Sequence, residues 1–344
     1  MTMADSGRIF AADQLVASLY RGILGRAPDD GGLISHVRLL EQGMPLADIV
    51  RQFVICPEFL AKRVAVIGAA VDALEASSAN PIQLAMDEPE RELLWQHVAR
   101  EWTQLGRQDP YFSVLTGEEY RRENLSPDAI ARFYDSGRWD LQRCEHYLAR
   151  HGLRLPQDGV CVDYGCGLGR ATLWLAQRCK RVLAVDISEA HLAMAREALA
   201  QRGIDNVEFH LLRQRADLAV LDRADFFHSV IVLQHNPPPI ILDILERAFA
   251  GLNHGGSAFF QVPTYLKGYR WNLDEYVAGN LPRGSIEMHV LPQSAVFAAA
   301  LQHRCLPVEV EPDHCTGLPN CISNTFVFVK PERPSPMAGH CAVQ

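Results

Sequence analysis

The sequence predicts an α/β fold with seven strands in its C-terminal half, preceded by a region that is helical. Residues 158–330 alternate strand-like apolar runs with helical stretches, which is typical of a parallel sheet whose strands are joined by helices. Residues 12–62 and 90–153 instead show helical spacing. Four segments are expected: a helical module at 1–65, a linker and helical lid at 66–153, an α/β core at 154–330 and a disordered proline-rich tail at 331–344.

Composition excludes several classes of protein. The 344 residues are 48% hydrophobic and 22% charged, as in an ordinary globular protein, and the net charge of −8 argues against a nucleic-acid partner, which normally requires a basic face. The nine cysteines show no C-x-x-C spacing, so a reducing cytoplasm is expected rather than a disulfide framework. Neither a signal peptide nor an apolar run long enough to span a membrane is visible.

The N-terminal module carries three predicted helices within residues 12–62. The pattern L-x-R-x-P-D-x-x-G at 24–32, and the later Cys56-Pro57-Glu58-Phe59, resemble a small bacterial domain of unknown function that recurs in surface-layer, secreted and glycan-associated proteins. The sequence departs from that family at His36, where an aromatic residue is usual, and at Cys56, where serine is usual. A protein partner that binds through residues 12–62 is one possibility that the sequence leaves open.

Two acidic residues in this module, Asp29 and Asp30, raise the question of calcium binding. The loop lacks the D-x-[DN]-x-[DN]-G ladder and the distal glutamate of an EF-hand. A polar turn between two helices is therefore the interpretation we prefer.

A glycine-rich turn follows the first strand of the core, which is predicted at 159–163 and ends in Asp163. Glycines at 165, 167 and 169 lead into a helix predicted at 168–179. A dinucleotide fingerprint, G-x-G-x-x-G, would need a glycine at 170, where the chain has Arg170. A nicotinamide-dependent dehydrogenase is therefore disfavoured.

The second strand, predicted at 181–186, ends in Asp186, 23 residues after Asp163. A carboxylate about 20 residues beyond such a turn can reach ribose hydroxyls, because it ends the neighbouring parallel strand. Asp186 could alternatively cap the next helix, but Ser188 supplies that cap equally well.

The two acids and the D-x-G-x-G-x-G spacing together resemble the class I methyltransferases that depend on S-adenosylmethionine (SAM) and have a Rossmann-like sheet. The resemblance implies SAM as the cofactor, with its cationic methionine end near the first acid, its ribose on the second and its adenine on the residue that follows. An acid after the third strand is expected near the adenine amino group. The implied cofactor-binding residues are Asp163, Gly165, Cys166, Gly167, Gly169, Asp186, Ile187, Asp217 and Gln234.

The fourth strand, predicted at 225–233, runs into Gln234 and His235, which should face the methyl group because ligands bind at the carboxyl ends of parallel strands. The Asn-Pro-Pro triplet at 236–238 is similar to a motif of amino-group methyltransferases. Pro239 stands where that motif has an aromatic residue, and an aromatic is what stacks on a flipped base. The prolines are better interpreted as the first turn of a helix at 239–251.

His235 is the predicted general base, because a hydroxyl acceptor must lose a proton and a histidine titrates near neutral pH. A purely structural histidine is the alternative. His289 is the second candidate, since it should return above the same pocket before a helix at 292–303. No His/Cys group shows metal-ligand spacing, so no metal is predicted. The aromatic residues at 265–276 suit either a ring-bearing acceptor or packing of the lid.

The remaining core elements follow from the same alternation. Strands are predicted at 207–211, 257–262, 307–311 and 324–330, and a further helix at 189–202. The expected function is transfer of a methyl group from SAM to a hydroxyl of a small molecule or glycan, the glycan hint coming from the N-terminal module alone. The alternative is a non-catalytic SAM-binding or scaffolding protein that works through that module.

Overall fold

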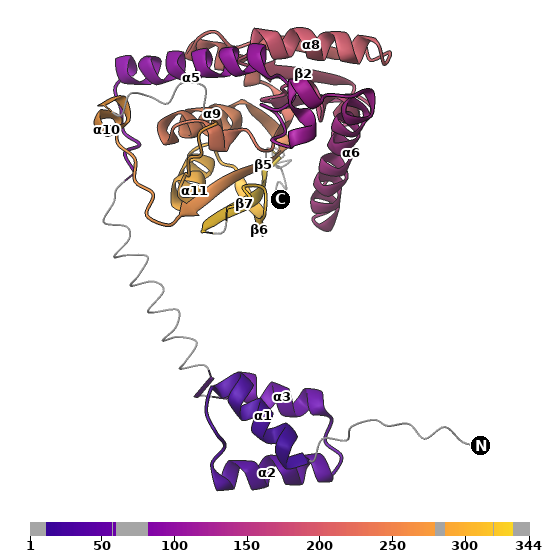
Figure 1. Ribbon diagram of the computed structural model, residues 1–344, viewed down its shortest axis with the longest axis vertical. Coiled ribbons are helices and arrows are strands. Elements are labelled where there is room, and N and C mark those ends of the chain that lie inside the picture. Colours follow the sequence, from indigo (N-terminus) through magenta and orange to yellow (C-terminus); the bar gives the residue numbers. More distant parts are fainter. Residues whose placement is uncertain (1–11, 57, 60–81, 279–285, 319, 333–344) are drawn as a thin grey trace, which may run out of the picture. The chain divides into compact units, whose positions relative to one another are not determined.

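The computed structural model describes residues 12–56, 58–59, 82–278, 286–318 and 320–332. The chain divides into two compact units, Met1–Ala79 and Asn80–Gln344 (Figure 1). Most of the predicted linker, and all of the predicted disordered tail after Glu332, lie outside the described residues.

The first unit is helical, as predicted. Its helices are α1 (Ala12–Leu24), α2 (Asp30–Glu41) and α3 (Leu46–Ile55), and they bury Val16, Tyr20 and Phe53 among others. The Asp29 carboxylate accepts the backbone N–H of Gly32 at 2.8 Å. Asp29 is therefore the N-cap of α2, which agrees with the polar-turn interpretation.

The second unit contains a sheet of seven strands in the order β3-β2-β1-β4-β5-β7-β6 among the described residues. All neighbouring pairs are parallel except those that β7 makes with β5 and β6. The predicted seven-stranded α/β sheet is thus confirmed, with one strand reversed. The strands are β1 (Val160–Tyr164), β2 (Arg181–Asp186), β3 (Val207–Leu211), β4 (Ala224–Ser229), β5 (Leu252–Leu266), β6 (Leu306–Asp313) and β7 (Cys321–Val329).

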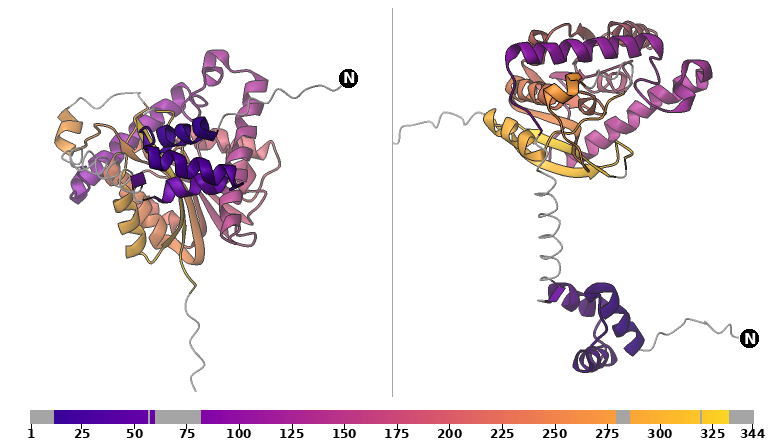
Figure 2. Two further views of the ribbon diagram at one scale, coloured as in Figure 1. Left: turned by 90° about the horizontal axis from the view of Figure 1, so that it is seen from below. Right: turned by 60° about the vertical axis from the view of Figure 1, so that its left-hand side comes forward.

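Helices cover both faces of this sheet, so its strands are apolar on both sides (Figures 1 and 2). One face packs on α5 (Glu88–Gln108), α9 (Pro238–Gly251) and α11 (Gln293–Gln302). The other packs on α6 (Pro127–Arg150), α7 (Thr172–Leu175) and α8 (Glu189–Ala200). Short elements complete the unit: η1 (Glu118–Tyr120), η2 (Arg122–Asn124), η3 (Arg215–Leu221), η4 (Leu233–His235) and α10 (Leu273–Ala278). None of the described helices is long and apolar enough to cross a membrane.

Two predicted elements end four residues earlier in the structure than in the sequence analysis. The helix predicted at 168–179 is reduced to the four residues of α7. It begins only after Gly169, because the φ of +80° at that residue is incompatible with a helix. The strand predicted at 225–233 ends at Ser229, because Ile231 has φ +59° and turns the chain out of the sheet. Positive φ is uncommon for a β-branched residue, and such strain is found preferentially at functional sites.

Candidate functional site

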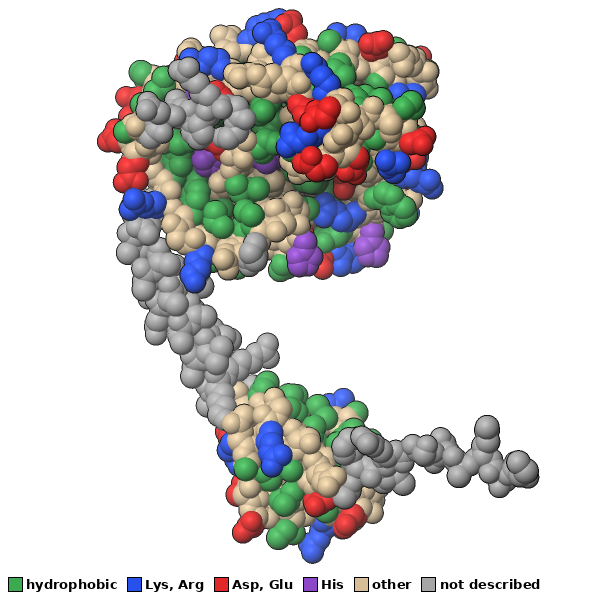
Figure 3. Space-filling view, in the orientation of Figure 1, with side chains coloured by type: hydrophobic (Ala, Val, Ile, Leu, Met, Phe, Trp, Pro, Cys, Tyr) green, Lys and Arg blue, Asp and Glu red, His purple; other side chains and the backbone are tan. Residues whose placement is uncertain are grey.

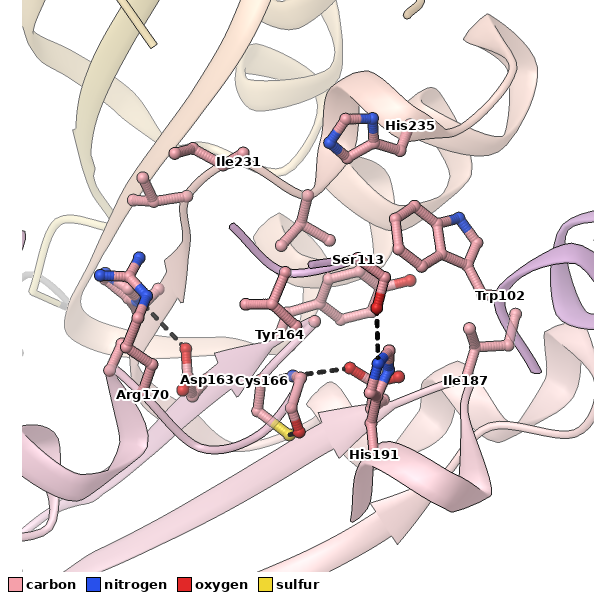
Figure 4. Close-up of a pocket in the computed structure, with 18 of the residues that line it drawn as sticks. Trp102, Ser113, Asp163, Tyr164, Cys166, Arg170, Ile187, His191, Ile231 and His235 are labelled. Atoms are coloured by element: carbon pink, nitrogen blue, oxygen red, sulfur yellow. Dashed lines mark hydrogen bonds and ion pairs between the residues drawn. The ribbon is translucent and has the colours of Figure 1, made fainter. Parts of the chain in front are cut away.

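A pocket lies at the carboxyl ends of β1, β2 and β4, as expected for a parallel sheet (Figure 4). Trp102 and Ser113 contribute from the helical lid, and the glycine turn lies beneath. Among the predicted site residues, those that line this pocket are Asp163, Gly165, Cys166, Gly167, Asp186, Ile187 and His235.

The glycine turn is held tightly against β2. The backbone N–H groups of Gly165 and Cys166 both donate to the carbonyl oxygen of Val185, at 2.8 and 3.1 Å. Gly165 has φ +71°, and a Cβ atom there would lie 2.2 Å from Cγ1 of Val232, so no larger residue fits. The turn amides are therefore used within the protein and are not free to cradle a phosphate.

Asp186, at the end of β2, joins this turn to the next helix. Its Oδ2 accepts the N–H of Gly167 at 2.8 Å and its Oδ1 accepts the N–H of Ser188 at 2.8 Å. The Ser188 hydroxyl accepts from the N–H of His191 and is the N-cap of α8, as the sequence analysis expected. Each carboxylate oxygen of Asp186 keeps a second lone pair for a ligand.

Asp163, at the end of β1, is buried at the opposite end of the pocket. Its Oδ2 accepts the Thr172 hydroxyl at 2.6 Å, and its Oδ1 lies 2.9 Å from Nδ1 of His228 on β4. Arg170 lies beside it, with its guanidinium bonded to Ser136 and to Asp140 on α6. In Figure 4, Asp163 and Arg170 lie on the side of the pocket away from Ile187 and His191.

His235 lies on the loop after β4 and borders the pocket beside Trp102, with 5.4 Å between the ring centroids. Its Nδ1 lies 2.7 Å from the carbonyl oxygen of Glu287. A carbonyl only accepts, so Nδ1 carries the hydrogen and Nε2 is the bare nitrogen. Burial lowers the pKa of His235 to about 4, which is below the near-neutral titration expected from the sequence, so the ring is neutral at physiological pH.

Residues 161–256, which contain both acids, the glycine turn and His235, match the family model described as a methyltransferase domain. This segment is a methyltransferase domain. The cofactor of this class is SAM, and the Rossmann-like fold agrees with it.

The chain is also similar to several curated proteins, over limited lengths. It is 36% identical over 108 residues to a carboxy-S-adenosyl-L-methionine synthase of Trichlorobacter lovleyi, covering 30% of this chain and 44% of that protein. It is 33% identical over 157 residues to a trans-aconitate 2-methyltransferase of Variovorax paradoxus, covering 45% of this chain and 56% of that protein. The chain spans less than half the length of the first of these relatives.

Among solved structures, the chain resembles a magnesium protoporphyrin IX methyltransferase from Synechocystis PCC 6803 with bound SAH. The sequence identity is 15% and the TM-score 0.47, over 68% of this chain and 99% of that one.

His289 does not line the pocket of the methyltransferase domain, contrary to the expected position. Its Nδ1 lies 2.7 Å from the hydroxyl of Tyr269, and its Nε2 lies 2.7 Å from Oε2 of Glu287. Both ring nitrogens are therefore occupied, and His289 has no free lone pair with which to act as a base. Burial raises the pKa of Glu287, but hydrogen bonds from His289, His97 and Tyr276 outweigh it and lower that pKa to about 2.

Three further predicted cofactor residues do not line this pocket. Gly169 faces α8, where an added Cβ would lie 2.8 Å from Cδ1 of Leu199. Asp217 uses its carboxylate locally, accepting the N–H of Arg213 at 2.8 Å. Gln234 is buried, and its Oε1 accepts from the side chain of Gln261 at 2.9 Å, which also bonds the N–H of Ile231.

Sequence reasoning missed several residues that line the methyltransferase pocket, chiefly Arg170, His191 and His228. Arg170 was used only as evidence against a dinucleotide. His191 lies on α8, and its Nε2 lies 2.9 Å from the Ser113 hydroxyl, while burial lowers its pKa. A histidine within an otherwise apolar strand was the available signal for His228.

Within the part of the chain that the structure describes, no group of three or more His, Cys, Asp or Glu residues is placed to hold a metal ion.

Proposed function

We propose that this protein transfers a methyl group from SAM to a hydroxyl group of a small molecule or glycan. One observation carries the proposal. Asp163 and Asp186 end adjacent strands and border a single pocket, while the turn amides between them are consumed by β2. The pocket presents two carboxylates, and the amides of Gly165, Cys166 and Gly167 are already bonded within the protein, which suits a cationic cofactor with ribose hydroxyls and disfavours a pyrophosphate.

The residues present fit this cofactor. Asp186 would hold the ribose hydroxyls through its remaining lone pairs, and Ile187 would pack on the adenine. The acidic end at Asp163 would hold the methionine portion. When bound, SAM supplies the transferable methyl group on a positively charged sulfur. The protein then mainly has to position the acceptor and exclude water.

His235 would receive the acceptor's proton. Its bare Nε2 is fixed by the Nδ1–H bond to the Glu287 carbonyl, and Trp102 flanks it with a flat apolar surface on which a sugar or other ring can lie. The Gln234 amide nitrogen lies 3.4 Å from Nε2, a long contact that an acceptor hydroxyl can replace.

A small molecule or glycan is favoured over a nucleic acid. The net charge is −8, and on the face drawn in Figure 3 acidic and basic side chains are interspersed and do not form one basic patch. The trans-aconitate methyltransferase named above also acts, by its name, on a small molecule. The glycan option rests on the resemblance of the N-terminal module.

Two measurements test the proposal. S-adenosylhomocysteine should stabilise the protein by about 2.7 kcal/mol at one hundred times its dissociation constant, and NAD should not. Mass spectrometry of a host lysate incubated with SAM, with and without the protein, should show a product heavier by one methylene. Stabilisation by NAD and none by S-adenosylhomocysteine would overturn the assignment.

The alternative is a SAM-binding protein without turnover that works through residues 12–62. Its favouring observation is that α2 and α3 expose Ile34 (62%) and Leu46 (45%), as a protein-binding surface would. Cofactor binding without any methylated product in the same experiment would select this alternative.

A further inference from the structure

His228 is a buried histidine on the central strands of the sheet that the reaction proposed above does not use. It is 2% exposed, lies opposite Asp163 in the register of β4 and β1, and lines the pocket. Its ring stacks on Phe259, with 6.0 Å between centroids and 5° between planes, so its orientation is fixed.

The hydrogen bond to Asp163 determines which ring nitrogen is available. Nδ1 lies 2.9 Å from Oδ1 of the carboxylate, and a carboxylate accepts, so Nδ1 carries the hydrogen. Nε2 is buried and has no hydrogen-bond partner among the described residues. A buried polar atom without a partner is costly, at roughly 1–3 kcal/mol, so a ligand that donates to Nε2 recovers this free energy.

Asp163 already accepts two hydrogen bonds. One oxygen accepts from His228 and the other accepts from Thr172 at 2.6 Å. Its charge also acts on a ligand through the imidazole ring, whose Nε2 becomes a stronger acceptor when Nδ1–H is bonded to a carboxylate.

We propose that Nε2 of His228 accepts a hydrogen bond from the α-ammonium group of SAM. This inference rests on the function proposed above. The ammonium is the donor at the amino-acid end of that molecule, whereas its carboxylate would be repelled by the bare nitrogen. The ends of β2 and β4 are two strand spacings apart, about 10 Å, so a ligand with its ribose on Asp186 reaches His228 only with its far end.

Arg170 is the positively charged residue at the Asp163 end of the pocket. Its guanidinium lines the same pocket but is paired with Asp140, so its positive charge is balanced within the protein, while Asp163 bonds directly to His228.

The test is isothermal calorimetry with two ligands that differ only at the ammonium: S-adenosylhomocysteine and its deaminated analogue. In the wild-type protein, deamination should weaken binding roughly 10- to 100-fold, the effect of losing a hydrogen bond to a charged group. In His228→Asn, whose amide can still donate to Asp163 but has no atom at the position of Nε2, both ligands should bind with equal, weakened affinity.

Two further variants make the result decisive. His228→Gln places an acceptor near the position of Nε2 and should restore part of the difference between the ligands. His254→Asn, at an exposed histidine on the far end of β5, should leave both affinities unchanged. If the wild type binds both ligands equally, or if His228→Asn preserves their difference, the inference is overturned while SAM binding stands. If neither ligand binds the wild type, the proposed function fails and this inference with it.

Discussion

Nδ1 of His235 lies 2.7 Å from the carbonyl oxygen of Glu287, a residue 52 positions later in the chain. The bond links the loop after β4 to the segment that leads into α11, and it fixes the tautomer of the imidazole. Nε2 is left as the nitrogen that can take a proton. The role of His235 can therefore be tested with a variant that keeps the hydrogen bond made by Nδ1 and removes Nε2.

His235→Asn should lower kcat by roughly 10²–10⁴-fold once the acceptor is known, the usual contribution of a positioned base. The asparagine amide can still donate to the Glu287 carbonyl, so the loop should keep its place while Nε2 is lost. Affinity for S-adenosylhomocysteine should change little. Near-normal turnover in this variant would show that His235 is structural and that methyl transfer depends on positioning alone.

The free energy of unfolding should fall in mild acid because of His235. The folded-state pKa of His235 is about 4, below its ordinary value of 6.5, so the unfolded chain takes up the proton first as the pH falls. Between pH 7 and pH 4.5 this costs roughly 2–3 kcal/mol. Urea unfolding at both pH values should show a smaller loss for His235→Asn than for the wild type. Identical losses of stability in the wild type and in His235→Asn would show that the His235 ring is exposed to solvent.

Asp186→Asn should weaken binding of S-adenosylhomocysteine by roughly 1.5–3 kcal/mol, because the ribose loses a charged acceptor. The structure adds a second effect. The carboxylate also accepts the N–H groups of Gly167 and Ser188, so the free energy of unfolding should drop by about 1 kcal/mol even without ligand. Calorimetry and urea unfolding measure the two effects separately. Unchanged affinity would exclude Asp186 from the ribose site.

Gly165→Ala and Gly203→Ala form a matched pair, because both glycines have φ +71°. A Cβ at 203 meets open space, so that variant should lose roughly 1–2 kcal/mol from the left-handed backbone alone. A Cβ at 165 would lie 2.2 Å from Val232, and overpacking should add roughly 1–3 kcal/mol and weaken cofactor binding. Equal losses of stability in the two variants, by thermal or urea unfolding, would contradict the close approach of Gly165 to Val232.

Removal of residues 1–79 should leave binding of S-adenosylhomocysteine intact. The pocket and both acids belong entirely to the unit Asn80–Gln344. Calorimetry on the shortened protein checks this, with circular dichroism to confirm folding. A folded fragment that does not bind would mean that the helical module takes part in the cofactor site.

The sheet could be predicted well because its signals are local. The strands at 181–186 and 207–211 are confirmed at the predicted residues. The first is a short apolar run between polar ends, and the second alternates apolar and polar side chains. The carboxylates at the ends of β1 and β2 follow from the same reasoning. The positive φ of Ile231 could not be predicted, because it depends on a hydrogen bond to Gln261, 30 residues away.

Contacts between side chains of different strands and loops were harder to predict from the sequence. His228 faces Asp163 only because of the register of β1 with β4, which the sequence does not specify. His289 was expected over the pocket, but Glu287 and Tyr269 hold it through both nitrogens. The positions of these two side chains thus depend on buried hydrogen bonds between distant segments, which the local sequence pattern does not predict.

Gly137 on α6 has a consequence for where a working fragment of this protein can begin. A Cβ there would lie 2.0 Å from the carbonyl oxygen of Arg170, so the helix and the glycine turn touch backbone to backbone. The matched family segment starts only at 161, after this helix has ended. A fragment cut at that point would open one wall of the cofactor loop to water. The smallest fragment that keeps this site closed therefore includes α6. Substitutions at 137 and at 165–170 should depend on one another, because these backbones are in contact.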